Sequence, residues 1–147
     1  SPGTGLRSLQ QPSLVFDLGM CEQNCNLCSQ ICPVMAIKPI ITEHKKFLKI
    51  GEVVYKQNLC VVETNGTDCG ACAEHCPTQA VRMVPYRNNL MIPQTDPSIC
   101  IGCGSCEHIC PVRPDKAIIV KPVAEQTIIT LPEQEKLAPK AENEFPF

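Results

Sequence analysis

The chain has 147 residues, a formal net charge of −2 and a pI near 5.9. This balance gives no basic surface for nucleic acid, and apolar runs such as residues 117–120 are far shorter than the roughly 18 residues of a membrane span. Tryptophan is absent, aromatic residues make up 4% and prolines number 14, which excludes a large aromatic core. Disulfides or metal must therefore help to hold the fold, and the 12 cysteines are the candidates.

Residues 1–12 are rich in Gly, Ser, Gln and Pro and predict an N-terminal arm. The arm begins with Ser rather than Met, so we expect a processed chain or a piece of a longer protein.

Three repeats of one pattern follow the arm. Each holds an extended apolar run, four cysteines ending in Cys-Pro, a short alanine-led segment and a second extended run. The first repeat spans residues 13–50, with strands predicted at 13–16 and 36–41. The second and third repeats span residues 51–122, with strands predicted at 52–56, 80–84, 90–93 and 117–122. Residues 123–147 contain no cysteine and predict a tail that wraps the surface, with an edge strand at 127–131.

The third cysteine group, CIGCGSCEHICPV at residues 100–112, has the spacing C-x2-C-x2-C-x3-C-P. This spacing is typical of bacterial two-cluster ferredoxins: three cysteines of one loop hold three corners of a 4Fe–4S cubane, and the cysteine before proline ligates the other cluster. Gly102 and Gly104 would let backbone N–H groups approach the cluster sulfurs.

The other two groups depart from this spacing. The first is C-x3-C-x2-C-x3-C-P from Cys21, and the second is C-x8-C-x2-C-x3-C-P from Cys60. Asn65-Gly66 within the eight-residue insert is a turn signal and predicts a small hairpin or loop. Neither departure removes a ligand, so the 12 cysteines predict three clusters.

Disulfides and zinc are the alternative uses of these cysteines. Six disulfides fit the even count, but cysteines two or three residues apart offer few sound bridge geometries. Structural zinc usually takes two well-separated C-x2-C knuckles, whereas here three or four cysteines fall within about a dozen residues. A disulfide framework also leaves the Cys-Pro pairs without a role.

The segments CVVETNGTDCGACAEHCPTQAVRMVPY and CIGCGSCEHICP resemble polyferredoxins of the NapG/MauM type, which accompany periplasmic nitrate reductase and methylamine dehydrogenase systems. The resemblance runs from about residue 16 to residue 120. Members of that family usually carry a further cysteine group upstream. The resemblance therefore implies either the C-terminal part of a longer protein or a shorter relative that acts as a subunit.

The predicted fold is a small, loop-rich α+β fold. Its centre is a bacterial-type two-cluster ferredoxin-like module with pseudo-two-fold symmetry. A third cluster-binding repeat and the wrapping C-terminal tail extend this module.

Cross-ligation between the second and third groups predicts which cysteines share a cluster. The predicted ligand sets are Cys21, Cys25, Cys28 and Cys32 for the first cluster, Cys60, Cys69, Cys72 and Cys110 for the second, and Cys100, Cys103, Cys106 and Cys76 for the third. The alternative pairs the first group with the second and leaves the third alone.

The predicted function is electron transfer without catalysis, because the clusters use every cysteine and no catalytic residue is recognised. His44, His75 and His108 form no triad or metal-ligand spacing; the last two flank ligand cysteines and either tune a cluster potential or are simple polar turn residues. Two alternatives remain: a catalytic cluster with an open iron, which needs a three-cysteine site, and a structural or interaction module of a larger complex that clusters merely staple.

The partners and the compartment follow from the resemblance alone. It implies that single electrons pass between a membrane or quinol-linked partner and another redox protein, in a membrane-associated complex. It also implies the periplasmic or exported side, or membrane association, with the cytoplasm as the alternative.

Overall fold

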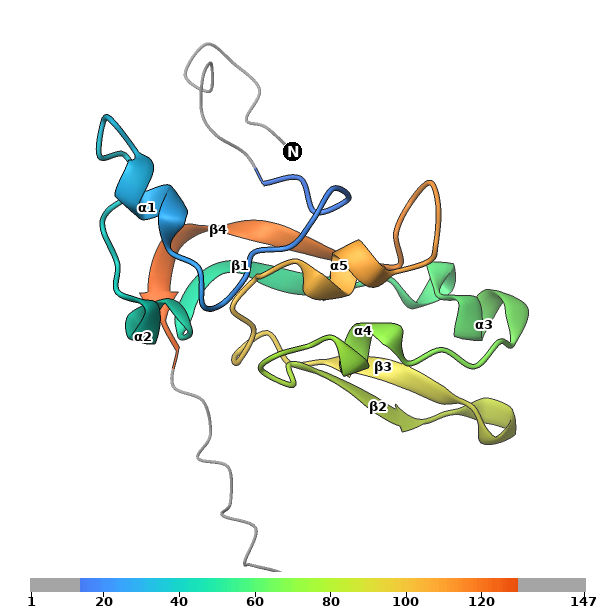
Figure 1. The fold of residues 1–147 in the computed structure, drawn as a ribbon. Coiled ribbons are helices and arrows are strands. Elements are labelled where there is room, and N and C mark those ends of the chain that lie inside the picture. Colours follow the sequence, from blue (N-terminus) through green and yellow to red (C-terminus); the bar gives the residue numbers. More distant parts are fainter. Residues whose placement is uncertain (1–13, 130–147) are drawn as a thin grey trace, which may run out of the picture.

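The structure, a computed structural model, describes residues 14–129 (Figure 1). The predicted arm and most of the predicted tail lie outside this range. The elements in chain order are α1 (Leu27–Ile31), α2 (Thr42–Lys45), β1 (Leu48–Tyr55), the 3₁₀ helix η2 (Gln57–Leu59), α3 (Val61–Asn65), α4 (Ala71–Glu74), β2 (Val81–Pro85), the 3₁₀ helix η3 (Arg87–Asn89), β3 (Met91–Thr95), α5 (Ser105–Ile109) and β4 (Ile118–Ile128). This small α+β architecture is consistent with a ferredoxin-type 4Fe–4S domain.

Two antiparallel two-stranded sheets frame the described part of the chain. Strand β1 pairs with the distant β4, with Val53 opposite Val120, while β2 and β3 form a hairpin. These four strands match the ones predicted in the second and third repeats. Strand β4 continues to Ile128, opposite Leu48, so part of the segment predicted as a tail is paired strand.

The core is small and contains many of the cysteines. Ile118 is its most buried large side chain, and Val53, Val62 and Val81 pack in the same cluster. The buried cysteines of this cluster are Cys60, Cys72, Cys100, Cys106 and Cys110. Because sulfur-bearing side chains fill much of the interior, whatever those sulfurs bind contributes directly to holding the fold together.

The first repeat differs from its prediction. Its described residues form α1 and α2 but no strand at 14–16 or 36–41, because no neighbouring strand offers hydrogen-bond partners there. Its helices α1 and α2 lie at the opposite end of the described region from α3 (Figure 1). Many of its large apolar side chains are exposed, including Leu18 at 87% and Val34 at 77%.

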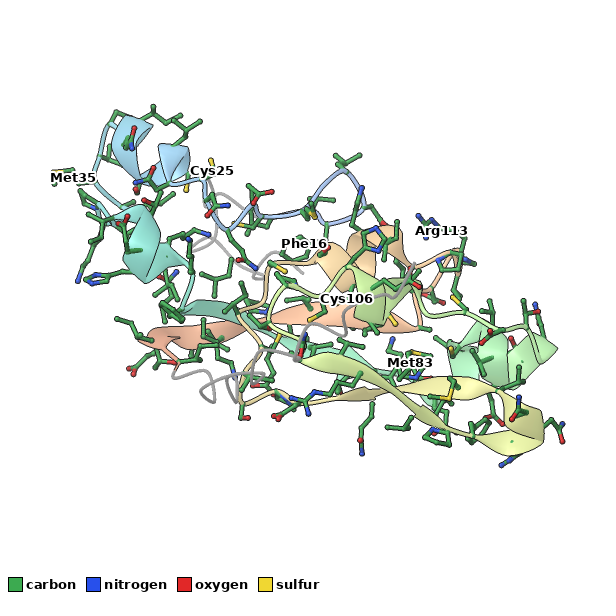
Figure 2. The ribbon with its side chains drawn as sticks, turned by 60° about the horizontal axis from the view of Figure 1, so that its bottom comes forward. Phe16, Cys25, Met35, Met83, Cys106 and Arg113 are labelled. Atoms are coloured by element: carbon green, nitrogen blue, oxygen red, sulfur yellow. The ribbon has the colours of Figure 1, made fainter. Side chains whose placement is uncertain are left out.

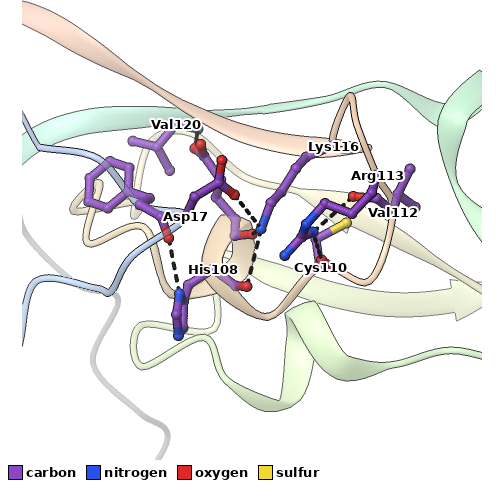
Figure 3. Close-up of polar contacts among 9 residues, drawn as sticks. Asp17, His108, Cys110, Val112, Arg113, Lys116 and Val120 are labelled. Carbon is purple, nitrogen blue, oxygen red and sulfur yellow. Dashed lines mark hydrogen bonds and ion pairs between the residues drawn. The ribbon is translucent and has the colours of Figure 1, made fainter.

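Contacts with the third repeat hold the start of the first repeat in place. The Cys21 backbone N–H donates to the Cys103 carbonyl at 2.8 Å. The Phe16 ring lies so close to Gly104 that a Cβ there would be 2.0 Å from Cδ1 of Phe16. Asp17 pairs with the buried Lys116 at 3.0 Å (Figure 3). These contacts place the first cysteine group beside the third.

The first five residues of the eight-residue insert form a helix, so the prediction of a hairpin or loop is corrected. Residues 61–65 form α3, and Gly66 ends it in the left-handed region at φ 63° with its N–H donating to the Val61 carbonyl. The Asn-Gly pair therefore acts as a helix C-terminus instead of a hairpin turn. Glu63 on α3 accepts a hydrogen bond from the Tyr86 hydroxyl, next to η3, which ties the insert to the β2–β3 hairpin.

Candidate iron–sulfur sites

The three cysteine groups share one local structure. In each group the third cysteine is the second residue of a short helix, and the fourth follows that helix within two residues. The helices are α1, α4 and α5, and the paired cysteines are Cys28 and Cys32, Cys72 and Cys76, and Cys106 and Cys110. The repeat seen in the sequence is thus also a structural repeat at the cysteines.

One cavity is bordered by three cysteines of the third group and one of the second. Cys100, Cys103 and Cys106 line it together with Cys76, which follows α4. Figure 2 shows Cys106 in the middle of the molecule. These four cysteines are the set that the predicted cross-ligation assigns to the third cluster.

A second cavity shows the reciprocal arrangement. Cys60, Cys69 and Cys72 line it together with Cys110, which follows α5. The neighbouring helices α4 and α5 contact each other, so the residue that follows each helix reaches the other group's cavity. The pairing of the first group with the second, the alternative wiring, finds no counterpart in these two cavities.

At each cavity, burial and neighbouring cysteines raise the pKa of the helical thiol, Cys72 or Cys106. Burial, followed by the neighbouring Cys69, Cys60 and Cys110, raises the pKa of Cys72 to about 12. The pKa of Cys106 is raised by burial and then by Cys100, Cys103 and Cys76. Crowded thiolates without a cation are therefore unfavourable, whereas a bound metal centre deprotonates its thiol ligands outright.

Backbone N–H groups oppose this effect at Cys100. Burial raises the pKa of the Cys100 thiol, but the N–H groups of Gly102 and Val53 act in the lowering direction. Gly102 therefore does place its N–H near a candidate ligand sulfur. Its missing Cβ serves a different purpose, because it allows close approach to the Gly51 backbone.

The donor set fits iron–sulfur clusters. Within residues 14–129, no three Cys, His, Asp or Glu side chains are grouped tightly enough to hold one metal ion. The sulfurs border cavities instead, as a larger centre requires. The Tyr55 hydroxyl at the second cavity is buried without a hydrogen-bond partner among the described residues. A cluster held there would offer sulfur acceptors to this hydroxyl.

The first group is less enclosed than the other two. Cys28 on α1 is exposed, and Cys21, Cys25 and Cys32 are half-buried. The pKa of the Cys32 thiol is lowered, chiefly by the backbone N–H of Ile37. Burial opposes this effect, and the backbone N–H groups of Val34, Ala36 and Met35 add to it. The buried Gln23 amide nitrogen in this loop has no partner within residues 14–129. This loop is rich in donors, as an anionic cluster requires.

Two residues near the candidate ligands carry no sequence signal. Lys45, whose spacing from the cysteines gives no hint, donates from Nζ to the Cys21 sulfur at 3.1 Å. Tyr55 lies at the end of β1, where burial, followed by the neighbouring Cys60 thiol, raises the pKa of its hydroxyl. Both contacts depend on tertiary placement, so spacing alone does not reveal them.

His75 and His108 contact backbone carbonyl groups at Nδ1. His75 Nδ1 lies 3.0 Å from the Ala71 oxygen, and His108 Nδ1 lies 3.0 Å from the Phe16 oxygen. Both histidines are exposed. These contacts favour the interpretation of both histidines as polar residues on short turns over a role in tuning a cluster potential. His108 also helps to hold the first repeat.

None of the helices between residues 14 and 129 has the length and apolar character that crossing a bilayer requires.

A family model described as a 4Fe–4S dicluster domain matches residues 67–113. Similar proteins include the methylamine utilization ferredoxin-type protein MauM of Methylobacillus flagellatus, 32% identical over 69% of this chain and 47% of the relative. MauM of Methylophilus methylotrophus is 33% identical over 56% of this chain and 38% of the relative. The ferredoxin-type protein NapF of Escherichia coli K12 is 25% identical over 69% of this chain and 57% of the relative.

The chain spans about half the length of these curated relatives. No solved structure matches it significantly. The dicluster-domain match and the ferredoxin-type relatives support the assignment of this chain as a polyferredoxin-like 4Fe–4S binding protein.

Proposed function

We propose that the chain binds three 4Fe–4S clusters with the twelve cysteines in the predicted sets. The single observation that carries the proposal is the exchange of Cys76 and Cys110 between the two cavities. A chain that used its cysteines as separate loops would have no reason to bring Cys110 beside Cys60 and Cys72. For the first group, the support is the shared helix geometry and the donors around its loop.

The ferredoxin-type relatives imply an electron carrier that performs no catalysis itself. When bound, a 4Fe–4S cluster takes up and releases one electron at a time. We propose that the three sites form a row, because Cys21 is hydrogen-bonded to Cys103 and Cys106 lies near Cys72. The row would relay single electrons between a membrane or quinol-linked partner and another redox protein.

The first repeat is the proposed contact region for a redox partner. It forms one end of the row, and its exposed apolar side chains adjoin the exposed Cys28. We propose a membrane-associated redox complex as the setting, on the periplasmic or exported side, with the cytoplasm as the alternative. This setting and this side rest on the sequence resemblance to polyferredoxins of the NapG/MauM type.

A structural role is the second candidate function, because cysteines occupy much of the core. Clusters that merely staple the fold could not be reduced and reoxidised without unfolding the protein. Repeated anaerobic cycles of dithionite reduction and reoxidation separate the two functions. Visible absorbance and hydrodynamic size are measured after each cycle. An electron carrier keeps its absorbance and its size through the cycles.

Iron content tests both the cluster number and the ligand sets. The full chain, purified without oxygen, should hold about twelve irons, four for each cubane. Replacing Cys60, Cys69 and Cys72 by Ala should leave about eight irons, since one cubane is lost. Adding Cys110→Ala to that variant should remove no more.

The reciprocal variant is the matched control. Replacing Cys100, Cys103 and Cys106 by Ala should again leave about eight irons, but adding Cys110→Ala should now leave about four. The opposite pattern, in which Cys110 matters only when the second group is already lost, contradicts the ligand sets. A colourless protein that contains only zinc contradicts the clusters altogether.

A further inference from the structure

We propose that Lys45 is a positioning residue that acts through Cys21 and raises the reduction potential of the cluster held by the first group. This inference rests on the proposed function, because it requires a cluster at Cys21. Lys45 is only 8% exposed, and its Nζ lies 3.1 Å from the Cys21 sulfur.

The environment of Lys45 differs from that of the other buried cation. Lys116 pairs with Asp17 and donates to two backbone carbonyls, so its charge has conventional partners. Lys45 makes none of the ion pairs found within residues 14–129, and the sulfur of Cys21 is the partner of its Nζ there. A buried ammonium is costly beside a neutral thiol and favourable beside a thiolate. A cluster ligand is such a thiolate.

Both members of the pair are held by the backbone. Lys45 ends α2, and its N–H donates to the Ile41 carbonyl at 3.0 Å. The Cys21 N–H donates to the Cys103 carbonyl at 2.8 Å. The ammonium is therefore fixed at the junction between the first site and the cavity lined by Cys103.

This position has a consequence for the potential. One-electron reduction adds a negative charge to a cluster and its ligands, and a nearby fixed cation stabilises the more negative state. Hydrogen bonds to ligand sulfurs act in the same direction. Lys49 offers a comparison inside the chain: it faces Cys100, but its ammonium already pairs with Glu52 at 3.2 Å and donates to the Pro97 carbonyl. Its charge is largely compensated, so it should contribute much less.

The test is a redox titration of the full chain, purified without oxygen and followed by electron paramagnetic resonance. The signal of the first cluster is identified as the one that disappears in a Cys25→Ala, Cys28→Ala variant. In Lys45→Met, the ratio of reduced to oxidised first cluster at the wild-type midpoint should fall at least tenfold, which is about 59 mV for a one-electron couple. Lys45→Arg should keep the ratio within about threefold. In the control Lys49→Met, the ratio for every cluster, including the one assigned to Cys100, should also stay within about threefold of wild type.

An unchanged midpoint in Lys45→Met, with iron content equal to wild type, overturns the inference. If Lys45→Met loses the first cluster, Lys45→Gln decides instead, because it keeps an N–H donor and removes the charge. A tenfold loss in that variant supports the role of the charge, and an unchanged ratio overturns it. Failure of the proposed function looks different: wild-type protein itself would contain too little iron and show no signal that depends on Cys25 and Cys28.

Discussion

The close approach of Gly102 to Gly51 makes Gly102→Ala a sharp test of how the ligand loop is held. Gly102 lies between two candidate ligands in the left-handed region at φ 75°. A Cβ added there would lie 2.2 Å from the Gly51 nitrogen and 2.3 Å from its Cα. These atoms belong to the backbone of β1, which is also bonded to the loop through Ile50 N–H and the Ile101 carbonyl at 2.9 Å. No side-chain rotation relieves such a contact.

Two costs add at Gly102. The left-handed conformation costs an alanine about 1–2 kcal/mol, and overpacking in a close-packed region costs about 1–3 kcal/mol more. Gly66 provides the matched control, because its φ is 63° but nothing lies within 4 Å of its added Cβ. Gly66→Ala should therefore carry only the first cost, about 1–2 kcal/mol.

The assay is the half-time for loss of visible cluster absorbance at a fixed guanidinium concentration without oxygen, since irreversible unfolding is properly described by a rate. Gly102→Ala should bleach at least about fivefold faster than Gly66→Ala, which corresponds to the lower end of the overpacking cost, about 1 kcal/mol. Equal half-times for the two variants would refute the reasoning, because the contact with Gly51 would then contribute nothing. Slower bleaching of Gly102→Ala would refute it as well.

Three further predictions concern other contacts. Lys116→Met should lower the free energy of detaching the start of the first repeat by about 2 kcal/mol, the scale of hydrogen bonds to a charged group. Chymotrypsin should therefore cut after Phe16 faster than in wild type. An unchanged cleavage rate would contradict the anchoring role of Lys116. Tyr55→Phe should lower one cluster potential by roughly 20–60 mV, equivalent to one hydrogen bond, without loss of iron, and a constant set of potentials would exclude the contact with the cluster. The hydrogen bond to Glu63 raises the pKa of Tyr86 above its usual 10. The stability that this hydrogen bond contributes is therefore present below pH 10 and is lost as the pH rises through the raised pKa. Tyrosinate absorbance in a Tyr55→Phe background should therefore appear at lower pH after Glu63→Gln, and identical titrations would count against this bond.

The sequence predicts the central part of the fold because short-range spacing controls it. The apolar runs at 80–84 and 90–93 predict strands, and β2 and β3 lie within one or two residues of those bounds. The cysteines around each cavity are the ones that cross-ligation groups together, while ligation itself stays a prediction.

Features outside these intervals were harder to predict. The apolar runs of the first repeat look like strands, but a strand needs a neighbour, and residues 14–16 and 36–41 have none. Asn65-Gly66 suits a hairpin turn and a helix end equally well, and the insert forms a helix. The contact of Lys45 with Cys21 joins side chains 24 residues apart, and no periodicity encodes it.

The exchange of Cys76 and Cys110 between the two cavities also has a consequence for assembly during synthesis. The cavity that begins at Cys60 lacks one of its four cysteines until Cys110 has left the ribosome, and the other has all four of its cysteines only at Cys106. Both therefore become available for metal loading almost together, near the end of translation of the described region. The first group has all four cysteines of its predicted set once Cys32 has emerged, and its contacts with Cys103 and Lys116 form later. Loading of a nascent chain would thus proceed as one early event and one late, paired event.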